Sequence, residues 1–107
     1  MIYLATPYSD PDPAVREERF NVVNRVAARM MMEGLHVYSP ISHSHSIAKA
    51  GWLPTDWSFW ELYDTKMIIM CGQMIVLRQA GWAISTGVQH EIRIAAGLGH
   101  PIEYMDP

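Results

Sequence analysis

Short apolar segments alternate with longer segments of helical periodicity, and this alternation constrains the fold more than any other feature of the chain. Residues 1–5, 35–38 and 74–77 have the length and composition of buried strands, and a last strand is predicted near 101–104. Alternating strands and helices imply right-handed crossovers and a parallel sheet covered on both faces. The sequence therefore predicts a small doubly wound α/β fold, a flavodoxin-like or Rossmann-like three-layer sandwich with a parallel sheet of four to five strands.

Residues typical of helix ends set the boundaries of the first helix. Asp12 followed by Pro13 is an N-terminal signature, and Gly34 stands where the apolar stripe ends. After the second strand, Ser39-Pro40 is interpreted as the end of that strand and the start of a loop of about 15 residues. Loops of that length are often functional.

Two further helices are predicted on either side of the strand at 74–77. Thr55 is expected to cap a helix over 56–71, and Ser85 to cap a helix that Gly97 or Gly99 ends. No repeat, linker or low-complexity tract divides the chain, so residues 1–107 are expected to form a single domain.

Composition bears on partners and location. Half of the residues are hydrophobic, including eight Met and four Trp, which predicts apolar surface covered in a homo-oligomer, a dimer or tetramer. A net charge of −3 argues against a nucleic acid polymer or an anionic membrane as partner. No apolar run reaches the roughly 18 residues of a membrane span. Because Cys71 stands alone, no internal disulfide can form, and a cytoplasmic location is expected.

Two acidic residues interrupt the inward apolar stripes of the last two predicted helices. Asp64 lies on the stripe of the helix over 56–71, and Glu91 lies between Val88 and Ala95 on the next. Burial raises the pKa of a carboxyl group and nearby donors lower it, so such a pair can divide the roles of nucleophile and acid. Glycosyl transfer uses a pair of this kind. The alternative is structural: Asp64 caps a loop or pairs with Arg, and Glu91 borders the stripe and meets solvent.

The start of the Glu91 helix has the features of a ligand site. Ser85 is the predicted N-cap and Gly87 leaves the backbone bare, so free N–H groups face a polar or anionic ligand. Helical side chains lean toward the N-terminus, which brings Glu91 toward the same place. Ligands of doubly wound sheets bind outside the carboxyl ends of the strands, so the loops after Ala5, Tyr38 and the 74–77 strand are expected to meet there.

Three segments together resemble the nucleoside 2-deoxyribosyltransferase-like superfamily. Its S-x-G-V-x-x-E segment is similar to Ser85-Thr86-Gly87-Val88-Gln89-His90-Glu91. Its pattern D-x-x-x-apolar-x-x-A/C-D is similar to Asp64-Thr65-Lys66-Met67-Ile68-Ile69-Met70-Cys71-Gly72. Its opening strand, apolar-Tyr-apolar-A/C-G-P/S, resembles Met1-Ile2-Tyr3-Leu4-Ala5-Thr6-Pro7. The whole chain looks like a group of uncharacterised bacterial and phage proteins placed in that superfamily.

This resemblance implies N-glycosidic chemistry on a nucleoside or nucleotide. Glu91 corresponds to the nucleophile that attacks the sugar C1′, and Tyr3 to the residue that holds its carboxylate. Asp64 would position or protonate the departing base. The alternative for Tyr3 is a core tyrosine with its hydrogen bond satisfied. A non-catalytic module that binds a nucleotide or an ADP-ribose-type ligand is the alternative at the level of function.

The same resemblance implies a set of substrate contacts. Ser85 and the Gly87 amide would line the sugar or phosphate end, with Thr6 and Pro7 beside them. The chain departs from the family pattern where Thr6 replaces the usual Gly and Gly72 the usual Asp, and the first loop has no Arg to match the phosphate-binding Arg of the monophosphate branch.

Other aromatic and imidazole groups add possible contacts. His43 and His45 are expected to touch the base or a phosphate at the rim, or to cap the loop. On an extended strand their imidazoles would share one side, so a metal-dependent hydrolase is a further alternative, although no third ligand lies nearby and no metal is predicted. Trp57, one turn before Trp60, could stack on a nucleobase or belong to the core or a subunit interface. Without a G-x-G-x-x-G or P-loop motif, no dinucleotide, ATP or other cofactor is predicted.

Overall fold

The computed structural model describes residues 1–107 and contains four strands, four α-helices and one 3₁₀ turn. In chain order these are β1 (Ile2–Ala5), α1 (Pro13–Met32), β2 (Val37–Tyr38), α2 (Pro40–Gly51), α3 (Trp57–Cys71), β3 (Gln73–Leu77), η1 (Trp82–Ile84), α4 (Thr86–Gly97) and β4 (Ile102–Met105). All strands are parallel and pair in the order β2-β1-β3-β4. The predicted α/β class and the number of strands are thus confirmed.

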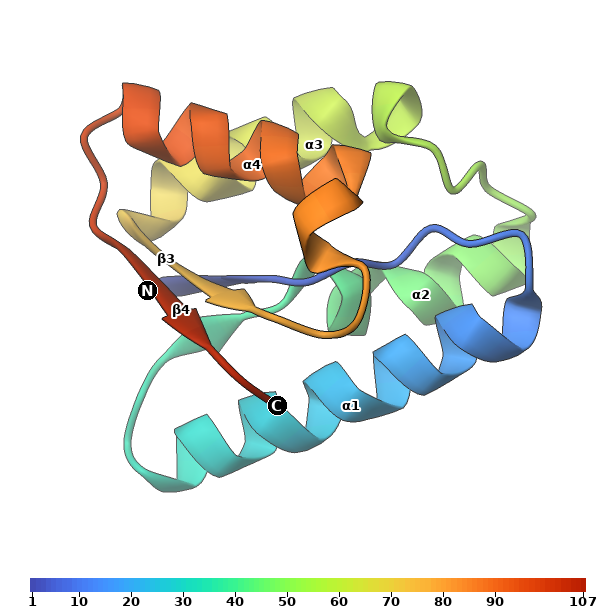
Figure 1. Cartoon of the computed structure of the whole chain (residues 1–107), viewed down its shortest axis with the longest axis horizontal. Coiled ribbons are helices and arrows are strands. Elements are labelled where there is room, and N and C mark those ends of the chain that lie inside the picture. The colour runs from blue at the N-terminus through green and yellow to red at the C-terminus, as the bar shows by residue number, and fades with distance from the viewer.

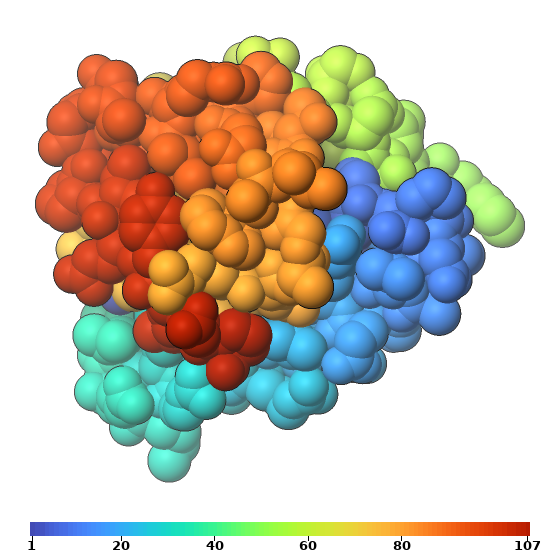
Figure 2. Space-filling model, in the orientation of Figure 1, coloured from blue at the N-terminus to red at the C-terminus, as the bar shows by residue number.

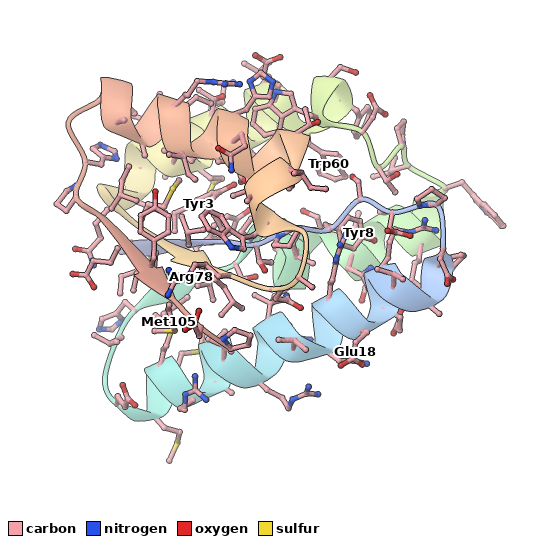
Figure 3. The ribbon with its side chains drawn as sticks, viewed as in Figure 1. Tyr3, Tyr8, Glu18, Trp60, Arg78 and Met105 are labelled. Carbon is pink, nitrogen blue, oxygen red and sulfur yellow. The ribbon has the colours of Figure 1, made fainter.

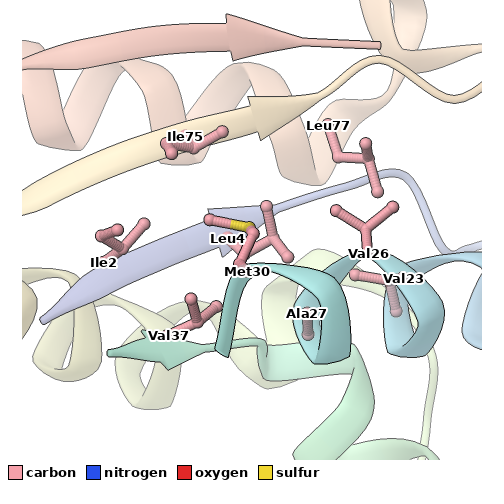
Figure 4. Packing of buried hydrophobic residues seen from close by; sticks show 9 residues of the cluster. All are labelled: Ile2, Leu4, Val23, Val26, Ala27, Met30, Val37, Ile75 and Leu77. Carbon is pink, nitrogen blue, oxygen red and sulfur yellow. The ribbon is translucent and has the colours of Figure 1, made fainter. Parts of the chain in front are cut away.

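The sheet forms the middle of three layers. Helix α1 covers one face, and α3 and α4 lie together over the other (Figure 1). Successive residues of β1 point to opposite faces. Ile2 and Leu4 join the core beneath α1 (Figure 4), whereas Tyr3 and Ala5 join the core beneath α3 and α4. Alternation along one short strand therefore gives two separate cores.

Helix α1 has the predicted ends. The Asp12 side chain accepts a hydrogen bond from the Ala14 N–H at 2.9 Å, and Pro13 occupies the first helical position. The chain turns away two residues after the helix at Gly34, whose φ of +88° lies in the left-handed region that glycine enters without strain. The predicted start of α3 is displaced by one residue, because Asp56 rather than Thr55 precedes it.

The loop predicted after β2 is wrong, because most of this segment is helix α2. Ser39 accepts a hydrogen bond from the Ser42 N–H at 3.2 Å and Pro40 begins the helix, the same N-cap and proline arrangement as in α1. The helix continues to Gly51 through residues rich in Ser and His, and Trp52 ends it in the left-handed conformation.

The strand order reverses direction between β1 and β3. The chain leaves β1 toward β2 on one side and returns past β1 to place β3 and then β4 on the other. The carboxyl ends of β1 and β3 therefore flank the crevice where doubly wound sheets bind ligands. No helix of the chain is both long enough and apolar enough to cross a membrane.

Candidate active site

A cavity of about 480 Å³ opens at the carboxyl ends of β1 and β3. Its walls come from the loop after β1, from α1 and α2, from the start of α3, and from the segment that leads through η1 into α4. In the space-filling view the first loop, the segment before α4 and the start of α3 meet at this part of the surface (Figure 2). The volume falls in the range of small-molecule sites.

Glu91 lies on the inward side of α4, at the cavity wall. It is 5% exposed and is buried together with Val88 and Ala95, as the apolar stripe predicts. The hydroxyl of Tyr3, which is fully buried in β1, donates a hydrogen bond to Oε2 of Glu91. Tyr3 lies beneath α4 in Figure 3. The predicted pairing of Tyr3 with Glu91 is thus present, and the structural alternative of a solvent-facing Glu91 is wrong.

Asp64 reaches the same cavity from α3. Its side chain is only 8% exposed, and Oδ1 is buried without a hydrogen-bond partner. It forms no ion pair with an arginine and caps no loop, so neither structural alternative for Asp64 applies. A buried carboxyl oxygen left without a partner is costly, and a ligand in the cavity is the natural partner.

Burial changes the acidity of both carboxyl groups. Loss of solvation raises the pKa of Asp64 from 3.8 to about 7. The pKa of Glu91 rises from 4.5 to about 8, mainly through burial and also through the charge of Asp64, while the hydrogen bond from Tyr3 acts in the opposite direction. The two groups therefore exchange protons near neutral pH, where acid–base catalysis needs them to do so.

The N-terminus of α4 borders the cavity as predicted. Ser85 accepts a hydrogen bond from the Val88 N–H at 3.3 Å, and both Ser85 and Gly87 line the cavity. A Cβ atom at Gly87 would make an ordinary van der Waals contact, 3.8 Å from the ring of Trp57. Trp57 lines the cavity too, with its ring parallel to His90 at a centroid distance of 5.2 Å and its buried Nε1 without a partner.

Thr6 and Pro7 are buried at the end of β1 and line the cavity. The Thr6 hydroxyl donates to the Leu77 carbonyl at 3.3 Å and accepts from the Gln79 side-chain amide at 2.9 Å. Gln79 also donates to the carbonyl of Arg19 at 3.1 Å. These bonds connect the carboxyl ends of β1 and β3 to the second turn of α1 beside the cavity.

His43 and His45 point to different sides because both lie on helix α2. Residues two apart on an α-helix point to nearly opposite sides, so the shared side expected for an extended strand is wrong. His45 is buried and lines the cavity. His43 does not line it; its Nε2 lies 2.9 Å from the Tyr63 hydroxyl on the exposed side. No three His, Cys, Asp or Glu side chains lie close enough together to bind a metal ion.

Sequence reasoning missed several residues of the cavity. Tyr8 and Arg19 both line it, and Arg19 donates to the carbonyls of Ser9 at 3.0 Å and Ala80 at 3.2 Å. Tyr8 lies three residues after the end of β1, so its place in the loop after a strand was a usable signal. Arg19 reaches the cavity from the second turn of α1, and nothing in its local sequence indicates that.

One protein family matches the chain. The family model described as "Domain of unknown function (DUF1937)" matches residues 1–106. No curated protein matches the chain. The match spans every residue that lines the cavity, but it carries no chemistry, so any function must be argued from the geometry.

Proposed function

The chain belongs to the DUF1937 family, and we propose that it cleaves or transfers the N-glycosidic bond of a nucleoside or nucleotide, with Glu91 as the nucleophile. The observation that carries this proposal is the buried carboxyl pair. Glu91 accepts a hydrogen bond from Tyr3, and Asp64, whose Oδ1 is buried without a partner, lines the same small-molecule cavity. The resemblance of the Glu91, Asp64 and Tyr3 segments to nucleoside 2-deoxyribosyltransferase-like proteins supports the same chemistry.

The surroundings of the two carboxyl groups support different roles for them. Only Glu91 has a donor, the Tyr3 hydroxyl, that stabilises its anion. No donor reaches Oδ1 of Asp64, so the neutral acid is favoured there by burial. In the reactive form Glu91 carries the negative charge and Asp64 the proton. In the empty cavity the pKa values, about 8 for Glu91 and about 7 for Asp64, favour the proton on Glu91, so the bound substrate has to reverse this order.

Two displacements at the same carbon complete the reaction. Glu91 attacks C1′, the C1′–N bond breaks with its electron pair moving to the base, and the proton of Asp64 passes to the base. Water or a second base then attacks C1′, the bond to the carboxylate breaks, and Glu91 regains its negative charge. Asp64 recovers a proton from the attacking molecule. Two inversions leave the configuration at C1′ unchanged.

The remaining cavity residues supply contacts for the two ends of such a substrate. Free N–H groups at the start of α4, beside Ser85 and Gly87, suit the sugar or a phosphate on it. Trp57 and Trp60 line the cavity and offer aromatic surface to a base.

The test is release of free base, measured by chromatography. Wild-type protein and Glu91→Gln are incubated with deoxy- and ribonucleosides and their 5′-monophosphates, with and without an acceptor base. Glu61→Gln, which changes an exposed carboxylate of α3, is the matched control. We expect release by wild type and Glu61→Gln but not by Glu91→Gln, and dependence on the acceptor distinguishes transfer from hydrolysis. Intact-protein mass spectrometry should detect the sugar attached to Glu91.

Two results contradict the proposal. Equal base release by wild type and Glu91→Gln would exclude the nucleophile. The second is that no compound releases free base, while a ligand still raises the Tm of both wild type and Glu91→Gln. This result would instead indicate a non-catalytic nucleotide-binding or ADP-ribose-type module.

A further inference from the structure

A second chain of polar groups lies on the wall formed by α1, α2 and the loop after β1. The Tyr8 hydroxyl lies 2.6 Å from Nδ1 of His45, and Nε2 of His45 lies 2.7 Å from Oε2 of Glu17. His45 is 4% exposed, and its ring stacks on Phe20 at a centroid distance of 4.2 Å. Tyr8 and His45 both line the cavity, and Figure 3 places Tyr8 toward α1 rather than beneath α4.

The charge of Glu17 determines which ring nitrogen of His45 carries the proton. The hydrogen bond from His45 lowers the pKa of Glu17, and Lys49 lies 3.5 Å from the same carboxylate oxygen. Glu17 is therefore an acceptor only, so Nε2 of His45 must carry a hydrogen to donate to it. In the neutral ring the other nitrogen, Nδ1, then holds a lone pair.

This tautomer in turn fixes the direction of the Tyr8 hydroxyl. A lone pair on Nδ1 of His45 accepts the Tyr8 proton, so that proton points at His45 and is not available to a ligand. The Tyr8 oxygen can then act toward a ligand only as a hydrogen-bond acceptor, through its lone pairs. A ligand that meets Tyr8 must bring its own donor, a hydroxyl or an amino group.

We propose that Tyr8, His45 and Glu17 form a recognition site of the cavity, in which the Tyr8 oxygen accepts a hydrogen bond from a hydroxyl or amino group of the ligand. Tyr8 makes the contact, while His45 and Glu17 are positioning residues that orient its hydroxyl. The nucleoside nature of the ligand rests on the proposed function, whereas the orientation of the hydroxyl does not.

The same helix supplies an internal comparison. His43 and Tyr63 form a second tyrosine–histidine pair at 2.9 Å, but both side chains are exposed, neither lines the cavity, and no carboxylate bonds the other ring nitrogen. Tyr63→Phe is therefore a matched control for Tyr8→Phe, since each variant removes one hydroxyl bonded to a histidine of α2.

The first measurement is the tautomer of His45, from its ring ¹⁵N chemical shifts in the full chain. We expect the neutral ring to carry its hydrogen on Nε2, and Glu17→Gln, whose amide can present either a donor or an acceptor, to give a mixture of tautomers. A neutral ring with its hydrogen on Nδ1 in the unaltered chain would overturn the proposal, because the Tyr8 proton would then be free to face the cavity.

The second measurement is binding by calorimetry in a Glu91→Gln background, which keeps the ligand intact. The probes are adenosine, purine riboside, which lacks the 6-amino group, and the 2′-, 3′- and 5′-deoxy forms of adenosine. Removal of one of these groups from adenosine should weaken binding about five- to tenfold when Tyr8 is present and should not change binding to the Tyr8→Phe variant. The affected probe identifies the donor as the amino group or a particular hydroxyl, and Tyr63→Phe should match the parent.

Each failure has its own signature. If every probe loses the same affinity with and without the Tyr8 hydroxyl, the recognition site is overturned. If none of the probes binds, the nucleoside ligand, which rests on the proposed function, is overturned, and the tautomer of His45 decides whether Tyr8 is an acceptor. Failure of the proposed function appears elsewhere, as base release that is absent or independent of Glu91.

Discussion

The raised pKa of Glu91 has a consequence for stability that can be measured without a substrate. A carboxyl group whose pKa is higher in the folded than in the unfolded protein keeps its proton longer when folded. The folded state then binds more protons than the unfolded state between the two pKa values, so the free energy of unfolding falls as pH rises. This contribution is complete below pH 4.5 and is lost by about pH 8, the two values for Glu91.

The size of the effect follows from the same two values. Each proton contributes a slope of about 1.4 kcal/mol per pH unit. From pH 4.5 to about 8, Glu91 alone therefore lowers the free energy of unfolding by roughly 5 kcal/mol, a large part of the 5–15 kcal/mol typical of a domain. Glu91→Gln cannot ionise, and its amide oxygen can still accept the Tyr3 hydrogen bond.

The assay is urea unfolding of wild type and Glu91→Gln, followed by tryptophan fluorescence from pH 5 to 8. Between these limits the stability of Glu91→Gln relative to wild type should rise by about 4 kcal/mol. Glu61→Gln, at an exposed site, should follow wild type throughout. Parallel pH profiles for wild type and Glu91→Gln would refute the reasoning, because Glu91 would then titrate alike in the folded and unfolded chain.

Three further outcomes are expected. In the wild-type protein the hydrogen bond from Tyr3 lowers the pKa of Glu91, so Tyr3→Phe should raise this pKa and shift the pH dependence of base release upward. The rate should fall about 10- to 100-fold. Tyr38→Phe, which removes a neighbouring hydroxyl without a partner, should change neither the pH dependence nor the rate. Ser85→Ala should cost about 1 kcal/mol in urea unfolding, because the N-cap bond to the Val88 N–H is lost, and an unchanged midpoint would contradict that role. Light scattering coupled to gel filtration should give a dimer or tetramer, and a monomer would disprove the expectation drawn from the apolar composition.

The fold was predictable because its signals are local and repeated. Each strand is a short apolar run, and the Asp12–Pro13 and Ser85 N-caps mark helix starts that do not depend on distant contacts. Helix α2 was not predicted: a loop was expected there, although Ser39-Pro40 has the same N-cap and proline pattern as Asp12-Pro13. Its Ser- and His-rich sequence has low helix propensity, and the helix is held instead by packing on α1 and β1.

The site was predictable only where the chain pattern itself places a residue inward. Glu91 and Asp64 could be found because each interrupts an apolar stripe. The chain from Tyr8 through His45 to Glu17 joins three segments that no sequence spacing relates. Such contacts depend on how α1 and α2 pack, which is a property of the tertiary structure alone.

Asp64 shows why the cavity is best understood as a binding site rather than as a gap in packing. A leucine at this position of α3 would avoid the cost of a buried carboxyl oxygen with no hydrogen-bond partner, about 1–3 kcal/mol. Since Asp64 lines an open cavity, a ligand that reaches its carboxyl group with a donor, or with an acceptor for the protonated group, removes that cost on binding. The same group that weakens the empty protein therefore strengthens the complex, and the free energy gained is specific to ligands that place a polar atom against the Asp64 carboxyl group.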